Sequence, residues 1–305
     1  MFDEEGLVTL PHKTYASIKA NRDIIGVSDI FFCWGKTQLS KILKQKKIDK
    51  KKLILSGSLR IELLKKKYDY LFKDTVKKIQ TKYKNIQLFI SSYGYSNHFL
   101  DSEKNINNLI KLDFLKKKYE INDYKKYINY NKIRFENYIK NLEKIKNKSK
   151  NQIVIRPHPS ENHNFYINKF KKKKFLITSK FSVIEWIKAS KSIIHDYCTT
   201  SFEANILQKK TYYFSNFDKN FFLNKDVYKL SSKFENSFRN TNYKEDDIKK
   251  KILKKNIYNY KNISSLNIIC EIFKKFKKKT KLPFNRSKII KSKINLNYYS
   301  LKKNK

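Results

Sequence analysis

The sequence predicts an α/β fold with parallel sheets. Short runs of β-branched and aromatic residues alternate along the chain with amphipathic helical patterns, which is typical of parallel strands covered by helices. These runs are apolar throughout, as expected of strands that are buried on both faces. The alternation starts again near residue 85, so we expect two Rossmann-like domains at 1–84 and 85–276, followed by a basic tail at 277–305.

In the first domain, apolar runs at 29–34 and 52–57 each end at a glycine. We expect a strand at each run, because a short apolar run that stops at a glycine is bounded by a turn. Helical periodicity follows at 37–45 and at 69–83. These elements are fewer than a complete Rossmann-like half contains, so we predict that the N-terminal domain is incomplete.

In the second domain the same alternation continues over a longer stretch. The residues between the apolar runs are rich in Lys and follow helical periodicity. The basic tail has no apolar periodicity, and we expect it to be disordered. We predict strands at 86–92, 152–156, 175–178, 192–195 and 211–214, and helices at 102–147, 183–189, 200–208 and 246–277.

The composition indicates a folded protein with a strongly cationic surface. Of the 305 residues, 40% are hydrophobic and 15% aromatic, which argues against disorder, whereas the net charge of +43 comes almost entirely from Lys. Such a surface attracts anionic membranes and nucleic acids, although drift in an AT-rich genome also produces a Lys excess. Three isolated cysteines, no signal-peptide pattern and no apolar run of membrane-spanning length predict a cytoplasmic protein without disulfides.

The most informative segment is an apolar run at 153–155 that ends in Arg156-Pro157-His158-Pro159. Pro159 disfavours a helical conformation for His158, so the imidazole should lie on a stiff loop at the carboxyl end of a buried strand. Ligands bind at that edge of open α/β sheets. Arginine occurs at only six positions, and Arg156 beside a rigidly held histidine suits a phosphate or a carboxylate. The alternative is a plain turn with a surface histidine.

A second polar segment begins where the strand predicted at 192–195 ends. Hydroxyl side chains there lead into a helix, and hydroxyls at a helix N-terminus cap free amides that also attract anions. Thr199, Thr200 and Ser201 could therefore bind a nucleotide phosphate, while Glu203 accepts hydrogen bonds from ribose hydroxyls. The alternative is a capping box of Thr200 and Glu203 without any ligand.

Two further polar segments are candidates for a site. The carboxylates at 3–5 suit a solvated turn or, in a transferase, a general base, because one member of a crowded acidic cluster holds its proton more tightly. A polar, aromatic loop at 91–98 follows a predicted strand, and Gly94 in that loop permits close approach of a ligand to the backbone. An ordinary loop is equally consistent with the pattern at 91–98.

Several short motifs follow one another along the chain: Asp-Glu-Glu-Gly-Leu at 3–7, Phe-Cys-Trp-Gly-Lys at 32–36, Ser-Gly-Ser-Leu-Arg at 56–60, Gly-Tyr-Ser-Asn-His at 94–98, Arg-Pro-His-Pro-Ser-Glu-Asn at 156–162, Glu-Trp-Ile at 185–187 and Cys-Thr-Thr-Ser-Phe-Glu-Ala at 198–204. This set resembles the bacterial surface carbohydrate biosynthesis proteins, which are GT-B-type glycosyltransferases related to sialyl- and polysialyltransferases and to CDP-glycerol glycerophosphotransferases. The resemblance extends over about residues 2–215, and its most specific motifs are those at 156–162 and 198–204.

The resemblance implies transfer of a sugar from a nucleotide-activated, CMP-linked donor to a capsule or lipopolysaccharide acceptor, with no cofactor and no metal. It implies that Glu4 or Glu5 is the general base and that His158 serves the phosphate and leaving group of the nucleotide. It further implies donor contacts from Arg156, Pro157, Pro159, Ser160, Glu161, Thr199, Thr200, Ser201 and Glu203, and loop contacts from Gly57, Arg60, Ser92, Gly94, Asn97 and His98.

Two departures from the family pattern bear on activity. The family's Gly-Asn-Pro-Arg segment reads Gly57-Ser58-Leu59-Arg60 here, and family members carry further Rossmann-like structure before the acidic motif. We therefore expect activity to need that N-terminal portion, supplied by another chain. The alternative is a non-catalytic fragment that keeps the nucleotide-binding half.

Other functions also fit parts of the sequence. Transfer of a polyol phosphate from CDP-glycerol fits the same resemblance, because teichoic-acid-type polymerases share the layout and a His-Pro segment. A nucleic-acid-binding protein fits the charge, but Lys is spread along every segment and no known binding motif is found. If the acceptor is a lipid-linked glycan, the cationic surface and the tail at 277–305 would hold the enzyme peripherally at the anionic inner membrane.

Overall fold

The computed structural model describes residues 1, 7, 20, 22–45, 47–111, 118–145, 151–214, 225–234 and 246–279. The chain divides into two compact units, Met1–Ser265 and Leu266–Lys305. The described part of the second unit is residues 266–279, which belong to helix α13 (Ser265–Lys279). The candidate bases Glu4 and Glu5, and the tail beyond residue 279, lie outside the described residues.

The first unit begins with a two-stranded parallel sheet, in which Phe31 lies opposite Leu53 and Cys33 opposite Leu55. The strand–helix–strand pattern predicted over 29–57 is confirmed, because the apolar strand residues pack with the connecting helix around Ile42. The elements of this part are α2 (Arg22–Val27), β1 (Phe31–Cys33), α3 (Lys36–Leu43), the 3-10 helix η1 (Lys50–Lys52), β2 (Leu53–Leu55), α4 (Leu59–Glu62), the 3-10 helix η2 (Lys66–Leu71) and α5 (Lys73–Lys82).

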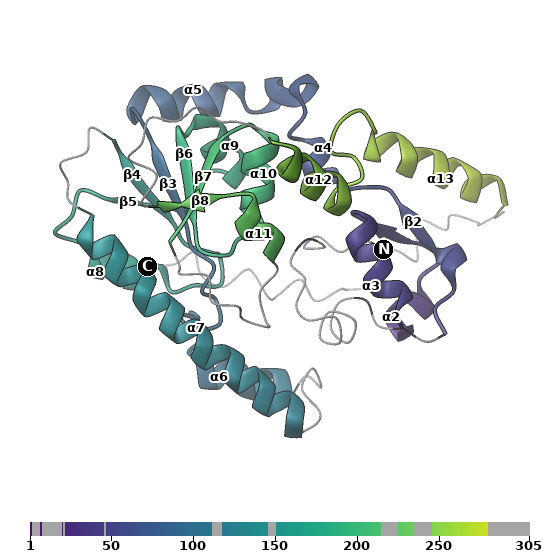
Figure 1. Cartoon of the computed structure of the whole chain (residues 1–305), viewed down its shortest axis with the longest axis horizontal. Coiled ribbons are helices and arrows are strands. Elements are labelled where there is room, and N and C mark those ends of the chain that lie inside the picture. The colour runs from purple at the N-terminus through teal and green to yellow at the C-terminus, as the bar shows by residue number, and fades with distance from the viewer. Residues whose placement is uncertain are drawn as a thin grey trace, which may run out of the picture. The chain divides into compact units, whose positions relative to one another are not determined.

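Six parallel strands form the larger sheet: β3 (Gln87–Ile90), β4 (Ile153–Arg156), β5 (Leu176–Ile177), β6 (Ser192–His195), β7 (Lys210–Tyr213) and β8 (Ser232–Lys233). Their spatial order is β5-β4-β3-β6-β7-β8 (Figure 1). This is the strand order of a Rossmann sheet, which reverses between its first and fourth strands, here β3 and β6. The predicted α/β fold with a Rossmann-like domain is therefore confirmed, and the reversal point fixes where ligands of such a sheet bind.

Helices cover both faces of the larger sheet (Figure 1). On one face, Trp186 and Ile79 pack against Leu88 of β3. On the other face, Tyr138 and Tyr166 pack against Phe89 of the same strand. Each such fully buried side chain contributes about 1.5–3 kcal/mol relative to its exposed state. The helices that follow β3 in the first unit are α6 (Ser102–Lys111), α7 (Lys118–Lys144), α8 (His163–Lys169), α9 (Val183–Ala189), α10 (Thr200–Ile206), α11 (Lys225–Lys229) and α12 (Asp247–Asn256).

Two of the predicted helices, at 69–83 and 246–277, are interrupted in the structure. The helix expected at 69–83 is divided into η2 and α5, because Phe72 ends the 3-10 turn before the α-helix begins. The helix expected at 246–277 is interrupted over 257–264, and the interruption has a structural reason. That segment leaves α12 to pack against the N-terminal part of the unit: the Tyr258 N–H donates to the Trp34 carbonyl at 2.7 Å. At Gly35 the approach is so close that a Cβ atom would overlap the backbone carbonyl of residue 256.

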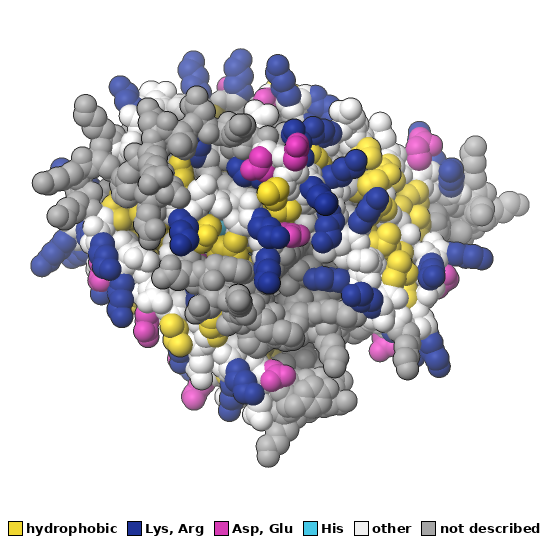
Figure 2. All heavy atoms as spheres, viewed as in Figure 1, with side chains coloured by type: hydrophobic (Ala, Val, Ile, Leu, Met, Phe, Trp, Pro, Cys, Tyr) yellow, Lys and Arg dark blue, Asp and Glu magenta, His cyan; other side chains and the backbone are white. Residues whose placement is uncertain are grey.

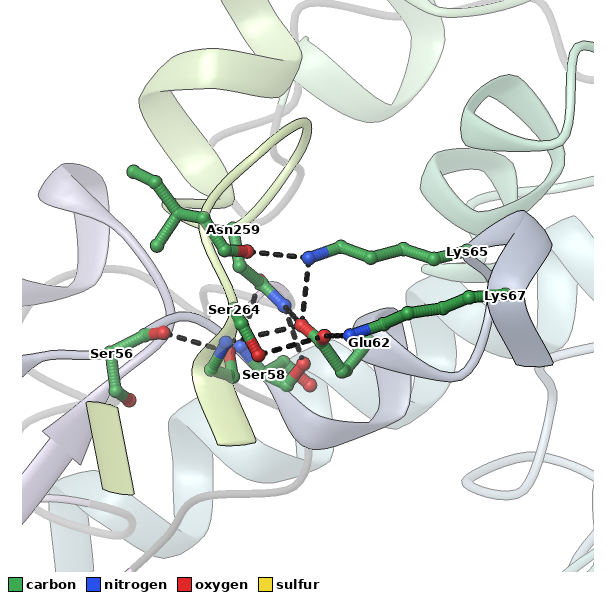
Figure 3. Close-up of polar contacts among 9 residues, drawn as sticks. Ser56, Ser58, Glu62, Lys65, Lys67, Asn259 and Ser264 are labelled. Atoms are coloured by element: carbon green, nitrogen blue, oxygen red, sulfur yellow. Dashed lines mark hydrogen bonds and ion pairs between the residues drawn. The ribbon is translucent and has the colours of Figure 1, made fainter. Parts of the chain in front are cut away.

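A buried carboxylate, Glu62, anchors this returning segment (Figure 3). Its two oxygens accept from Lys65 Nζ at 2.8 Å, Ser264 Oγ at 3.0 Å, Ser265 N at 3.1 Å and Asn259 Nδ2 at 3.3 Å, and Lys67 Nζ lies at 3.2 Å. Burial alone would raise the pKa of Glu62, but the hydrogen bonds from Lys65, Asn259 and the Ser265 backbone lower it to about 2. Helix α4 and the last residues of the unit are therefore joined through one ionised side chain.

Candidate active site

Three polar loops lie beyond the carboxyl ends of neighbouring strands at the point where the strand order reverses. In the sheet register, Ile90 at the end of β3 lies opposite Arg156 of β4 and opposite His195 of β6. The loops at 91–98, 157–162 and 196–201 therefore start level with one another. These loops contain three of the four segments that the sequence singled out, and the fold brings those three together.

The loops after β3 and β4 are joined by an isolated antiparallel bridge between His98 and Glu161. The Phe99 N–H donates to the Ser160 carbonyl at 3.1 Å, and the Asn162 N–H donates to the Asn97 carbonyl at 2.8 Å. The predicted contact residues Asn97 and His98 thus connect the loop at 91–98 to the His-Pro turn. The loops after β3 and β6 are also joined, because the Ser92 hydroxyl lies within hydrogen-bonding distance of the carbonyls of residues 196 and 197, at 2.9 and 3.0 Å.

His158 lies on the His-Pro turn with an exposed ring, between the buried Pro157 and the exposed Pro159. Its Nδ1 atom is 2.7 Å from Ser160 Oγ and 3.2 Å from the Ser160 backbone nitrogen. Gly94 lies directly beside this turn, and a Cβ atom there would overlap Ser160 Oγ. The aromatic loop and the His-Pro turn are therefore in close contact.

Arg156 is engaged within the protein. Its guanidinium donates to the Phe181 carbonyl at 2.8 Å and to the Lys180 carbonyl at 3.2 Å. Burial lowers the pKa of Arg156, an effect that the Glu185 carboxylate opposes. The side chain therefore fixes the turn before α9, where Ser182 and Glu185 form a capping box.

Glu161, predicted as a donor contact, is buried at 2% exposure, and its carboxylate joins the loops. It accepts from the N–H of Tyr93 at 2.8 Å, from the Ser91 hydroxyl at 2.9 Å and from the N–H of His158 at 3.3 Å, and also from the Tyr166 hydroxyl. Burial raises the pKa of Glu161, and the hydrogen bonds from Tyr166, Tyr93, Ser91 and His158 oppose this shift.

A buried ion pair beneath the loop at 196–201 was not anticipated from the sequence. Arg134 of α7 donates to the Asp196 carboxylate at 3.0 Å and to the Asp196 carbonyl at 2.7 Å, and the Tyr93 hydroxyl bonds to the same carboxylate. The Arg134 guanidinium also lies over the rings of Tyr93 and Tyr197. Burial in turn lowers the pKa of the neighbouring His195 to about 4, with Asp196 opposing the shift. This cluster fixes the position at which β6 passes into the polar loop.

At the start of α10 the predicted capping box is absent. Thr199 occupies the N-cap position without a side-chain hydrogen bond, and Glu203 instead forms an ion pair with Arg60 of α4. Glu203 is buried, and its Oε2 atom has no hydrogen-bond partner within the described ranges. The same holds for the buried Ser201 hydroxyl, whereas the Thr200 hydroxyl lies 3.2 Å from Cys198 Sγ. The alternative of a capping box of Thr200 and Glu203 is therefore wrong, and Glu203 pairs with Arg60 instead.

Gly57 and Arg60, the two loop contacts predicted in the N-terminal part, lie in different surroundings from each other. Gly57 adopts a φ of +81°, and a Cβ atom there would overlap the Asn259 side chain, so it belongs to the contact with the returning segment. Arg60 reaches Glu203 as described. Across the described part of the chain, no three His, Cys, Asp or Glu side chains are grouped as a metal site requires, and no helix is long and apolar enough to cross a membrane.

The chain matches no protein-family model and no curated protein sequence. Among solved structures it is similar to a variant of the wall teichoic acid polymerase TagF soaked with CDPG, at 14% identity and a TM-score of 0.48, over 85% of this chain and 59% of that one. It is also similar to the UDP-GlcNAc 2-epimerase of Neisseria meningitidis bound to UDP-GlcNAc, at 17% identity and a TM-score of 0.46, over 89% and 68% of the two chains. It is similar to the UDP-GlcNAc 2-epimerase of Methanocaldococcus jannaschii in complex with UDP-GlcNAc and UDP as well, at 15% identity and a TM-score of 0.43, over 82% of this chain and 62% of that one. The chain thus spans less than two thirds of the length of TagF.

Proposed function

We propose that this protein is a GT-B-type glycosyltransferase that moves a sugar from a CMP-linked donor to a surface polysaccharide. The observation that carries the proposal is the meeting of the loops at 91–98, 157–162 and 196–201 where the strand order of the Rossmann-like sheet reverses. These loops and the helix that follows them contain an exposed histidine, several hydroxyls and a buried carboxylate, one oxygen of which has no hydrogen-bond partner among the described residues.

The phosphate and the ribose of a nucleotide-linked sugar have suitable partners among these residues. The hydroxyls of Thr199 and Ser201 are donors for phosphate oxygens. Glu203 Oε2 is an acceptor for a ribose hydroxyl, while Arg60 holds the other carboxylate oxygen. A hydroxyl donor at Oε2 would also remove the cost of leaving a buried acceptor unsatisfied, which is about 1–3 kcal/mol.

The reaction we propose is a direct displacement. The acceptor hydroxyl oxygen forms a bond to the anomeric carbon, the bond from that carbon to the phosphate oxygen breaks, and CMP leaves. The acceptor proton passes to a carboxylate, for which Glu4 or Glu5 is our candidate. His158 stabilises the negative charge that develops on the departing phosphate.

The experiment is a melting-temperature series with CMP, CDP, UDP and GDP. A nucleotide present at a concentration of 100 times its Kd stabilises the folded chain by about 2.7 kcal/mol. We expect a stabilisation of this size with cytidine nucleotides. Glu203→Gln should weaken the effect, whereas Glu143→Gln, at an exposed carboxylate of α7, is the matched control and should not. No shift with any of the four nucleotides would contradict the proposal.

Turnover separates the proposed donors. Incubation with a CMP-linked sugar and, in parallel, with CDP-glycerol distinguishes a glycosidic product from a phosphodiester, which is the product of the alternative reaction. With the active donor, His158→Ala should lower turnover by roughly 10²- to 10⁴-fold. An unchanged rate in that variant would remove His158 from the mechanism.

For the acceptor we propose a lipid-linked glycan of a capsule or lipopolysaccharide, with the enzyme attached peripherally to the inner membrane. On the face of the molecule that Figure 2 shows, Lys and Arg side chains are spread out with few acidic ones between them. Such a distribution supports weak attachment to any anionic surface, since each Lys contributes about 1 kcal/mol at most near anionic lipid. In the sequence Lys is spread along every segment, whereas nucleic-acid readout needs a single basic face.

A further inference from the structure

The His-Pro turn closes on itself through the ring of His158. The backbone N–H of Ser160 points to His158 Nδ1 at a nitrogen–nitrogen distance of 3.2 Å, and Ser160 Oγ lies 2.7 Å from the same atom. A backbone N–H can only donate, so Nδ1 must accept with its lone pair. Two groups of one residue thus converge on one ring nitrogen.

From this geometry we infer that Ser160 is a positioning residue that holds His158 in the neutral tautomer with the proton on Nε2. The inference rests on the proposed function and makes it more specific. His158 would then stabilise the departing phosphate as a hydrogen-bond donor through Nε2–H, because Nδ1 is committed to Ser160. A proton on Nδ1 would place two donors, the ring N–H and the Ser160 backbone N–H, against each other.

Gly94 takes part in this arrangement from the neighbouring loop. A Cβ atom at position 94 would overlap Ser160 Oγ and would lie 3.7 Å from His158 Nδ1. Glycine therefore leaves the room in which the Ser160 hydroxyl can face the imidazole. The Ser160 side chain would have to rotate away in a Gly94→Ala variant, and its bond to His158 would be lost.

Glu161 holds the main chain of the same turn. Its buried carboxylate accepts from the N–H of His158 and from the N–H of Tyr93, and its own N–H donates to the His158 carbonyl at 2.9 Å. The backbone of His158 is therefore fixed at both its N–H and its C=O. With the backbone and Nδ1 both fixed, the direction of the Nε2–H bond is fixed as well.

The test uses the full chain labelled with ¹⁵N-histidine and long-range ¹H–¹⁵N correlation spectra, recorded without ligand. The chain has five histidines, and the spectrum of His158→Asn identifies the His158 signals by their loss. We expect an unprotonated Nδ1 and a protonated Nε2 in the wild type. Ser160→Ala and Gly94→Ala should both move the Nδ1 signal, whereas Gly26→Ala, at a glycine with open space around it, is the matched control.

A protonated Nδ1 in the wild type would overturn the inference, and so would Nδ1 signals that stay unchanged in both variants. Addition of CMP, the leaving group of the proposed reaction, then tests the link to function. CMP binding that shifts the Nε2 signal supports the inference, and we expect Ser160→Ala to weaken CMP binding roughly two- to tenfold, the effect of one hydrogen bond. CMP binding that leaves the Nε2 signal unshifted contradicts the inference. If CMP does not bind, the proposed function fails, while the tautomer in the free protein still decides the role of Ser160.

Discussion

Replacing Glu62 with glutamine should destabilise the protein in a pH-dependent way. The carboxylate is 2% exposed, forms ion pairs with Lys65 and Lys67, and accepts hydrogen bonds from Asn259 and Ser264 of the returning segment. A carboxyl group whose pKa falls from 4.5 to about 2 on folding contributes about 3 kcal/mol at neutral pH, because one pKa unit is worth about 1.4 kcal/mol. Solvent screening of the exposed Lys67 reduces this contribution, so we expect Glu62→Gln to cost about 2–3 kcal/mol.

The sign of the pH dependence follows from the lowered pKa. The unfolded chain takes up the proton first as the pH falls, so the contribution of Glu62 is complete above about pH 5 and is lost between 4.5 and about 2. The difference between wild type and Glu62→Gln should therefore shrink to about 1 kcal/mol near pH 3.

Urea unfolding followed by tryptophan fluorescence at pH 7 and pH 3 measures this difference. The matched control is Glu143→Gln, which removes a carboxylate paired with Lys169 at the surface and should cost less than about 1 kcal/mol at either pH. A Glu62→Gln effect as small as that of the control, or one that is the same at both pH values, would refute the reasoning.

Further predictions concern packing, a buried histidine and the tail. Gly35→Ala should cost about 1–3 kcal/mol because its Cβ would overlap a backbone carbonyl, whereas Gly26→Ala in open space should be neutral or mildly stabilising; thermal melts compare the two. Burial lowers the pKa of His195 from 6.5 to about 4, so the unfolded chain binds this proton first as the pH falls. The stability of the protein should therefore decrease as the pH falls from 6.5 to about 4, and the melting temperature of His195→Gln should depend less on pH over that range. The full chain should co-sediment with anionic liposomes at moderate salt more than a chain ending at residue 277, and equal binding would exclude a role for the tail.

The strands could be predicted because a strand that is buried on both faces consists of consecutive apolar residues. The run at 153–155 and the run at 192–195 each appear as strands within a residue of the expected bounds. Strand β8 has no apolar run, because Ser232 and Lys233 are polar and exposed. They form a strand only through pairing with β7. Helix α8 was missed for a related reason. It has one buried residue, Tyr166, and is too short for a clear apolar period.

The site could be predicted in its parts but not in its connections. Each polar loop follows a strand, and parallel strands bring their carboxyl ends to one edge, so the loops could be placed together from the sequence. The residues that fix them come from distant positions: Arg134 pairs with Asp196 across 62 positions, and Arg60 pairs with Glu203 across 143. No local pattern contains such a pairing. Arg156 is a different case: the motif predicted a ligand contact, but in the structure the Arg156 guanidinium donates to carbonyls of the turn before α9.

The returning segment also determines when the N-terminal part can complete its structure during synthesis. Glu62 emerges from the ribosome early, but its partners Asn259, Ser264 and Ser265 follow 197, 202 and 203 positions later. At about 5–20 residues per second, the ribosome needs roughly 10–40 seconds to translate that interval. Throughout it, a carboxylate destined for burial lacks three of its donors, and the surfaces around Gly35 and Trp34 stay uncovered. The packing around Gly35 and Glu62 therefore depends on residues made about 200 positions later, and a ribosome that stalls before residue 265 would hold a chain in which these contacts are not yet formed.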